Sequence, residues 1–467
     1  MRQSLLILLT FNAALFVLIQ IFNPAYLSDY KLAPNPDAPT YVELGRSFWI
    51  NGQYSRNLEP PFKPELTWTP VFPLVAGGLD ILFGVKGIFI FHILLSGACC
   101  VLMYYLALPW TGEKIANLAS LIFALDPFIY IYNFQAMSEI LFLFFLMLGL
   151  TLTVPVIFNK TVNRLFTRLI IGGIALSLAI LTRPAGLYIP LILVASAIIW
   201  ELYKRETLYK TFVYSGTLFL CGYLLVGIWM YRNYCLFGTF AVTGNDKITM
   251  VYYTAGGAWQ VHHKCTLEEA QKLIEQEYRL PPVDVCHNIN RFEITPQEID
   301  AQMKACRWDA LAKYPDSLII SVLTAVPKSL FAHETGLFAY LINQTWLPPG
   351  LSNLKNPVTF YNLLLKNSLL LSCFFIWSMI FQTTVVLAGV IAYFAILGKY
   401  RKEYGGVLLM LFLYTGYVFA SLGLFGVDCV ARYRLPLMPI IIVFAAITLT
   451  TLWEKCKTTS GNSKVKE

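Results

Sequence analysis

Six charged residues of this 467-residue chain lie in or beside segments that flank long apolar runs. Ionisable side chains at the ends of such runs indicate a function only if they converge on one face of the membrane. They are two acids and four arginines: Asp37, Glu139, Arg183, Arg232, Arg432 and Arg434. If the chain brings the six to one face of a membrane, their types define the chemistry that this face can perform.

Arginine and carboxylate together suit the transfer of a group away from a phosphate. Guanidinium stays charged and binds phosphate through paired N–H donors, so it can hold a lipid phosphate and stabilise the charge that develops as the phosphate leaves. A neighbouring carboxylate can take the proton of an attacking hydroxyl or amine. A monophosphate leaving group carries less charge than a diphosphate, so arginines can neutralise it and no metal or other cofactor is expected.

Each of these residues also has a structural interpretation. Asp37 lies in a proline-rich segment and can be a turn residue. Glu139 follows Ser138 at the expected start of a helix, where the helix dipole favours an acid. The arginines can reach lipid phosphates from the ends of their helices. The functional interpretation therefore depends on all six sharing one side of the membrane.

Membrane-spanning helices are the elements that would carry these residues. The chain is 57% apolar and 13% charged, with a mean hydropathy of +0.60 and a net charge of +8. This composition excludes a disordered or a soluble nucleic-acid-binding protein. Runs of about 20 apolar residues predict ten spans in an all-α polytopic fold. Seven are 4–23, 87–108, 115–132, 138–157, 212–231, 405–425 and 435–453; 169–200 gives two helices that meet at Thr182-Arg183-Pro184, and 366–397 gives one.

Basic clusters in the short loops give the expected orientation. The positive-inside rule places these loops and both termini in the cytoplasm, and the ten spans then alternate without conflict. The six charged residues all fall on the outer side of a plasma membrane, the inner membrane of a bacterial host. No small-x-small site follows the first run, so an uncleaved helix is expected rather than a signal peptide. The basic residues are Lys160, Arg164, Arg168, Lys204, Arg205, Lys210, Lys399, Arg401, Lys402, Lys455, Lys457, Lys464 and Lys466.

Three parts of the chain follow from this topology. Residues 1–231 form an N-terminal transmembrane module whose first outer loop, 24–70, carries Asp37. Residues 232–366 form a small, mostly helical extracytoplasmic cap, and 367–467 form the last helices and a cytoplasmic tail. One face of 266–278 is apolar, which predicts a helix in the cap. The apolar pieces 71–84 and 317–331 are too short to span and are expected at the interface.

Cysteines and histidines of the cap raise two further questions. Cys265, Cys286 and Cys306 permit one disulfide in an oxidising compartment, and the sequence leaves the pairing open. The spacing of His262-His263 and His287 fits no standard ligand set, so solvated loop histidines are expected there rather than a metal site.

The order of these motifs resembles the GT-C superfamily of membrane glycosyltransferases, especially the bacterial relatives of protein O-mannosyltransferases and of lipid A aminoarabinose transferase. The first loop carries an acid, a tyrosine and an arginine in the family's order, and later motifs follow to about residue 439. The matching residues are Asp37, Tyr41, Leu44, Arg46, Gly52, Tyr54, Thr69 to Leu74, Ser138-Glu139, Thr182-Arg183-Pro184, Arg232-Asn233-Tyr234, Phe237-Gly238, Arg432 to Pro436 and Pro439.

The resemblance implies an inverting transferase that moves a hexose or pentose from a polyprenyl-phosphate donor, outside the cytoplasm, to a lipid, glycan or protein. It implies that Asp37 is the general base or orients the acceptor and that Glu139 assists. The donor phosphate would be held by Arg183, Arg232, Arg432 and Arg434. Tyr41, Lys63 and Glu65 are weaker candidates. Relatives often carry two adjacent acids in this loop, whereas Ala38 follows Asp37 here.

Two other functions use similar residues. A transporter or flippase of lipid-linked sugars would place charges and broken helices near the bilayer midplane. A polysaccharide polymerase or ligase would use outer arginines on a diphosphate-linked oligosaccharide. The expected gathering of charges at one surface favours the glycosyltransferase over the transporter.

Overall fold

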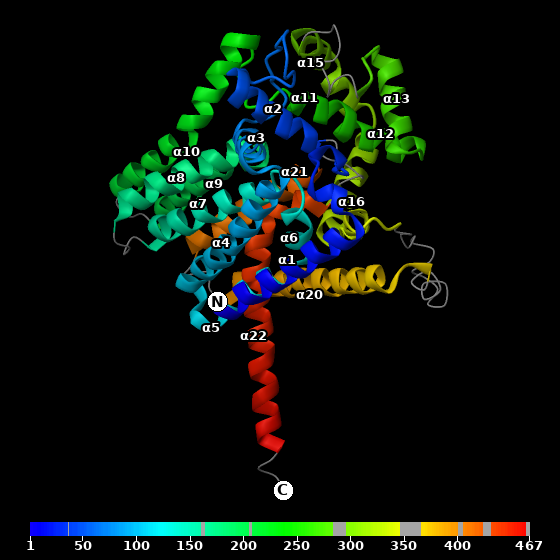
Figure 1. Ribbon diagram of the computed structural model, residues 1–467. Helices are drawn as coiled ribbons and strands as arrows, with labels where there is room; N and C mark the ends of the chain where they lie inside the picture. The colour runs from blue at the N-terminus through cyan, green and yellow to red at the C-terminus, as the bar shows by residue number, and fades with distance from the viewer. Residues whose placement is uncertain are drawn as a thin grey trace.

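The computed structural model describes residues 1–35, 37–159, 164–204, 208–283, 296–345, 366–399, 405–423 and 431–463. In this part of the chain the regular elements are all helices, which confirms the all-α expectation (Figure 1). Several residues named above lie outside the described ranges: Lys160, Arg205, Cys286, His287, Arg401, Lys402, Lys464 and Lys466.

Nine helices in the described ranges are long and apolar enough to cross a membrane, or ten if one bent pair counts as a span. This agrees with the ten predicted spans. The helices are α1 (Arg2–Phe22), α4 (Val85–Thr111), α7 (Glu139–Asn159), α8 (Leu165–Thr182), α9 (Ile189–Lys204), α10 (Leu208–Phe237), α20 (Leu369–Lys399), α21 (Gly405–Gly423) and α22 (Met438–Ser463). The predicted boundary after residue 231 lies within α10.

The bent pair replaces the single helix expected over 115–132. It consists of α5 (Glu113–Ala124) and α6 (Pro127–Asn133), which meet at 51°. The side chain of Asp126 accepts a hydrogen bond from the backbone N–H of Phe128 at 3.0 Å, and Pro127 takes the first helical position. Both features start a new helix, because an aspartate cap satisfies a free N–H and proline lacks one.

The break at Thr182-Arg183-Pro184 is confirmed. α8 ends at Thr182, a short 3-10 turn covers Pro184–Gly186, and α9 begins at Ile189. Arg183 between them has an extended backbone, with φ −147° and ψ 125°. Its side chain therefore leaves the helix end and points toward neighbouring elements.

Asp37 is the first residue of α2 (Asp37–Asn51), which packs against α3 (Val71–Phe83). The two helices touch at glycines: a Cβ on Gly45 would lie 1.9 Å from the carbonyl oxygen of Pro73. An ion pair of 2.6 Å between Arg46 Nη1 and Asp80 Oδ2 joins the same helices. This close packing fixes the helix whose first turn carries Asp37.

The polar segment after α10, where the sequence predicts a cap, contains a helical unit with its own small core. The predicted helix over 266–278 is α13, and Thr266 and Glu269 form a capping box at its start. Cys265 and Cys306 are both free thiols. The unit groups with α2 and α3 at the end of the molecule opposite the C-terminus (Figure 1). Its elements are α11 (Asn245–Ile248), a π-helical turn (Thr249–Ala255), α12 (Gly256–His263), α13 (Leu267–Tyr278) and α15 (Pro296–Ala312).

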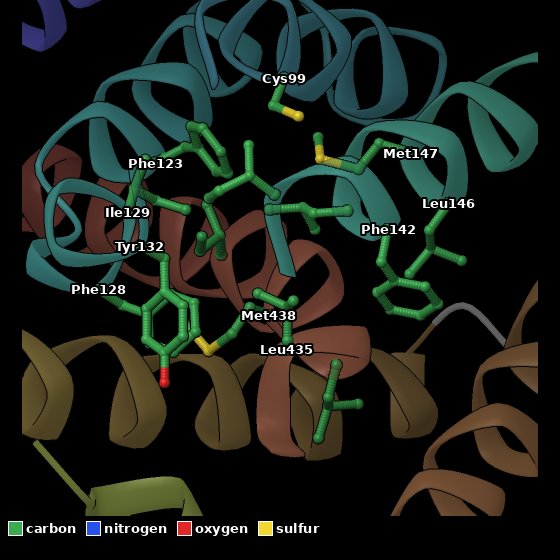
Figure 2. Close-up of a cluster of buried hydrophobic side chains, with 14 of the residues drawn as sticks. Cys99, Phe123, Phe128, Ile129, Tyr132, Phe142, Leu146, Met147, Leu435 and Met438 are labelled. Carbon is green, nitrogen blue, oxygen red and sulfur yellow. The ribbon is translucent and has the colours of Figure 1, made fainter. Parts of the chain in front are cut away.

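Two further helices connect this unit to the membrane helices. They are α16 (Pro315–Phe331), which covers the interfacial piece expected over 317–331, and α17 (Thr335–Leu341). A 3-10 segment, η7 (Ala431–Leu437), precedes α22 and packs against α16, α21 and α7. Figure 2 shows Leu435 and Met438 in one cluster with Phe142 and Met147 of α7. The segment that carries Arg432 and Arg434 is therefore anchored in the main core.

Candidate active site

Four of the six charged residues form one connected cluster, here called the ion network. Arg183 Nη1 lies 2.6 Å from Glu139 Oε1. Arg432 Nη1 lies 3.3 Å from Asp37 Oδ2 and 4.0 Å from Glu139 Oε1. Arg432 thus stands between the two acids. From the sequence, all six charged residues are expected on one face of a membrane; the structure brings these four into contact.

Four separate elements supply the ion network. Asp37 opens α2, Glu139 opens α7, Arg183 lies in the break after α8, and Arg432 lies in η7. Helix starts suit the two acids because the helix dipole stabilises negative charge there. Ser138 Oγ accepts a hydrogen bond from Arg183 Nη1 at 3.0 Å, which orients this guanidinium toward the acid that follows.

The network is buried on one side and open on the other. The Glu139 side chain is fully buried, whereas the side chains of Asp37 and Arg432 are 22% and 19% exposed. A buried carboxylate is costly unless it is paired, so Glu139 requires its arginines. Asp37 is the acid that an incoming molecule can reach.

Tyr41 lies within this electrostatic environment. Burial raises the pKa of its phenol, and the charge of Asp37 raises it further, with Glu139 acting in the same sense and the two arginines opposing. Tyr41 makes edge-to-face contacts with Trp68 at 5.0 Å and Phe72 at 5.1 Å between ring centroids. One turn of α2 after Asp37, it forms an aromatic wall beside the network.

Arg232 is not part of the network; it lines a separate cleft of about 330 Å³. Its Nη1 donates to the Glu65 carbonyl oxygen at 2.7 Å, and its guanidinium lies 4.7 Å from the Trp229 ring centroid. The other lining residues are mostly apolar: Phe48, Gly52, Gln53, Tyr54, Pro70, Leu74, Trp229 and Leu236. The cleft combines one cation with the surface that an aliphatic chain needs.

The segment from Glu65 to Thr69 connects this cleft with the network. Tyr54 lines the cleft and donates to the carbonyl oxygens of Trp68 and Thr69 at 3.2 and 3.1 Å. Trp68 contacts Tyr41, and Thr69 Oγ1 donates to the Thr182 carbonyl oxygen at 3.1 Å, next to Arg183. One short segment therefore touches both places.

Glu65 holds that segment in shape. Its carboxylate accepts from Arg56 Nε at 2.6 Å and from the backbone N–H groups of Leu66 and Thr67 at 3.0 and 2.6 Å. These partners occupy both carboxylate oxygens, which gives Glu65 a structural part. Lys63 is exposed, and its backbone N–H donates to Ser55 Oγ at 3.2 Å.

Arg434 is buried away from the opening of the network. It is 3% exposed, and its Nη1 donates to the carbonyl oxygens of Ser329 and Ala332 at 3.0 and 2.7 Å. Its guanidinium also lies over the Phe128 ring at 5.6 Å. These contacts join η7 to the end of α16.

Sequence reasoning missed two polar residues next to the network. The Tyr132 hydroxyl of α6 donates to Glu334 Oε1 at 3.2 Å, and the charges of Glu139 and Arg432 act on both residues. Tyr132 stands inside an apolar run and Glu334 after another, so neither has a distinctive pattern in the sequence. Trp68 beside Tyr41 was missed for the same reason.

Among the described residues, no three or more His, Cys, Asp or Glu side chains form a group that could hold a metal ion. In the cap, the His262 ring stacks on Tyr314 with 3.8 Å between centroids.

Comparison with known proteins gives one family match, over residues 82–242, to the model described as dolichyl-phosphate-mannose-protein mannosyltransferase. This is about a third of the chain. None of the curated protein sequences compared with the chain matches it.

Solved structures share the fold over nearly the whole chain. The archaeal oligosaccharyltransferase AglB from Archaeoglobus fulgidus, in complex with an inhibitory peptide and a dolichol-phosphate, gives a TM-score of 0.53 at 12% identity. That match covers 99% of this chain and 52% of the archaeal one, so the chain spans about half of that protein's length. The same enzyme tethered to an acceptor peptide gives 0.50 at 12% identity, covering 96% and 50%.

A further match is ArnT from Cupriavidus metallidurans bound to undecaprenyl phosphate, with a TM-score of 0.37 at 14% identity, covering 94% of this chain and 77% of that one. The family match and the fold shared with the archaeal enzyme confirm the resemblance to the GT-C superfamily.

Proposed function

We propose that this chain, a multi-pass membrane protein of the GT-C glycosyltransferase type, transfers a sugar from a polyprenyl-phosphate donor to an acceptor at the extracytoplasmic face. The observation that carries the proposal is the ion network: a reachable carboxylate, Asp37, held by an arginine that is shared with a buried second acid. Such a set can accept a proton and stabilise a leaving phosphate in one place.

The reaction follows from the positions of these groups. A hydroxyl or amine of the acceptor attacks the anomeric carbon, the bond from that carbon to the phosphate oxygen breaks, and the configuration inverts. Asp37 takes the acceptor's proton as the new bond forms, since it is the exposed acid of the network. The phosphate leaves with the electron pair, and Arg432 and Arg183 stabilise its charge. Glu139 keeps both arginines in place.

The cleft beside Arg232 fits the lipid part of such a donor. Its walls are mostly apolar, Arg232 places a positive charge on the path of the donor, and the segment from Glu65 to Thr69 leads from the cleft to the network. The matching family is named for a dolichyl-phosphate donor, and the archaeal structure is described with a dolichol-phosphate. Both names support a polyprenyl-phosphate sugar as the co-substrate.

The acceptor is a lipid, a glycan or a protein, and we place the reaction on the outer side because the basic loops are expected inside. The enzyme uses no metal, since the two arginines of the network supply the positive charge that a monophosphate requires. Transfer should then persist in EDTA. A requirement for added Mg²⁺ or Mn²⁺ would contradict this part of the proposal.

The test is a transfer assay on the purified protein in lipid nanodiscs. Radiolabelled mannose, glucose and aminoarabinose are supplied on polyprenyl phosphate, on polyprenyl diphosphate and on a nucleotide, with membrane lipids, glycans and peptides as acceptors. We expect transfer from polyprenyl monophosphate only, with an inverted linkage by NMR. Transfer from the diphosphate would indicate a polymerase or ligase. Movement of the donor across the bilayer without transfer would indicate a flippase.

A further inference from the structure

A second group of polar residues lies beside the ion network, around a small cavity where α6, α16, η7 and α20 meet. The cavity has a volume of about 10 Å³, the size at which one water fits. Glu334, His333 and Arg434 line it, together with Ser378 and Gln382 from α20. Ser378 Oγ and Arg434 Nε are buried there without a hydrogen-bond partner among the described residues.

Glu334 connects this group to the network. Its Oε1 accepts from the Tyr132 hydroxyl at 3.2 Å, across 202 positions of the chain. Tyr132 is held by its own helix, because its ring stacks on Phe128 at 4.1 Å and Arg434 covers the same Phe128 ring. Figure 2 shows the Tyr132 oxygen at the edge of the buried cluster, pointing away from Cys99, Phe123 and Met147.

We propose that Glu334 is a positioning residue of the transfer site, which acts through the Tyr132 hydroxyl and through Arg434 to hold Arg432 between Asp37 and Glu139. The proposal rests on the proposed function and adds a third acid to its site. Glu334 does not touch the reacting atoms. It accepts a hydrogen bond from Tyr132 of α6 and lies within the electrostatic reach of Arg434, which joins the segment that carries Arg432 to the end of α16.

The contacts of η7 support this role. Arg432 stands two residues before Arg434, and Arg434 donates to the carbonyl oxygens of Ser329 and Ala332, just before Glu334. The η7 segment, the end of α16 and α6 therefore form one unit. A charge placed on Glu334 favours the present positions of both arginines, since Arg434 and Arg432 lie within its electrostatic reach.

Protonation of Glu334 would weaken this arrangement. Burial raises the pKa of the Glu334 carboxyl above its usual range, Arg434, Tyr132 and Arg432 oppose the rise, and Glu139 adds to it. A carboxylate accepts the hydrogen bond from the Tyr132 hydroxyl more strongly than a neutral carboxylic acid does. The groups that face Glu334 are Arg432 and Arg434 from η7, Tyr132 from α6, Glu139 from α7, His333 from its own segment, and the neutral Ser378 and Gln382 from α20.

The test compares pH profiles of kcat for wild type, Glu334→Gln, Tyr132→Phe and their double variant, with Ser378→Ala as a control for disturbance of the cavity. In wild type, kcat should fall on the acid side as Glu334 takes up a proton. Glu334→Gln should have kcat about ten-fold lower at pH 8 and an acid limb shifted to lower pH, with KM for the donor changed less than three-fold. Tyr132→Phe should lower kcat by a similar factor, and the double variant should lower it little further, because both changes remove the same interaction.

A merely structural Glu334 would give another result. Glu334→Gln would then lower kcat and thermal stability together, while the acid limb of the pH profile kept its midpoint. Alternatively, the losses of kcat in Glu334→Gln and Tyr132→Phe would multiply in the double variant. Either result would overturn the proposal. Wild type that transfers no sugar from any donor would refute the proposed function instead. In that case the link between Tyr132 and Glu334 is tested by a double-mutant cycle on the free energy of unfolding. A coupling energy at pH 8 that is absent at pH 5 supports the link. No coupling energy at either pH overturns it.

Discussion

Removing Arg183 should destabilise the protein because it leaves a carboxylate buried without its nearest cation. Glu139 is fully buried, Arg183 Nη1 is 2.6 Å from it, and Arg183 is 16% exposed. Loss of one partner from a buried pair costs about 3–5 kcal/mol. Arg432 remains at 4.0 Å from the same carboxylate and offsets part of the loss. We therefore expect Arg183→Met to lower the free energy of unfolding by about 3 kcal/mol, at the low end of that range.

A double-mutant cycle separates this electrostatic effect from lost packing. Glu139→Gln removes the charge that needs a partner, so Arg183→Met should cost less stability when Glu139→Gln is already present. The coupling energy between the two positions should be roughly 2 kcal/mol. The chain offers a matched control in Lys114 and Glu454, whose charged atoms are also 2.6 Å apart but whose side chains are 62% and 60% exposed. A cycle of Lys114→Met and Glu454→Gln should give less than about 1 kcal/mol.

The assay is equilibrium unfolding in mixed micelles of mild detergent and SDS, followed by the helical circular dichroism of wild type and the six variants. A coupling energy for Glu139 and Arg183 no larger than that of the exposed control pair would refute the reasoning, since equal distances would then give equal energies regardless of burial.

Three further predictions follow from single positions. Gly45→Ala should unfold at clearly lower SDS, because its Cβ would meet the Pro73 carbonyl oxygen at 1.9 Å; Gly216→Ala in α10, with nothing within 4 Å, should be neutral or stabilising by up to about 1 kcal/mol. His333 is partly buried, and this burial, with the charge of Arg434, lowers its pKa from 6.5 to about 4. The stability that the neutral His333 ring contributes is complete above pH 6.5 and is lost as pH falls toward 4. The free energy of unfolding should therefore differ more between pH 7 and pH 5 in wild type than in His333→Asn. Arg232→Gln should weaken binding of polyprenyl phosphate about ten-fold, seen as a smaller ligand-induced rise in Tm, whereas Lys86→Gln on the exposed end of α4 should not; equal binding in both variants would contradict the donor cleft.

Much of the fold could be predicted from the sequence because a bilayer imposes a length on each span. Apolar runs gave the spanning helices, and Thr-Arg-Pro gave the break that frees Arg183. The bend at Asp126 was missed, since 115–132 is apolar enough to read as one helix and only the cap by Asp126 and Pro127 interrupts it.

The site was predictable in part. Topology places residues on one face but gives no distances within that face. It therefore grouped Arg232 and Arg434 with residues that the fold separates from them, one in a cleft and one under α16. Topology and the family resemblance placed Asp37 and Arg432 in one site, but their contact, which spans 395 positions, was not predicted. The contact of Tyr132 with Glu334 has no such signal and required the fold.

Substitution of Asp37 tests the central claim most directly. Sugar transfer from polyprenyl phosphate is compared in wild type, Asp37→Asn and Asp29→Asn, an acid of the same loop that caps a 3-10 turn, at equal amounts of folded protein in nanodiscs. The account predicts that Asp37→Asn loses about 10²- to 10⁴-fold in kcat while donor binding and Tm stay close to wild type, and that Asp29→Asn keeps its activity. Undiminished transfer by Asp37→Asn would contradict the account, because the reachable acid of the ion network would then not be the base.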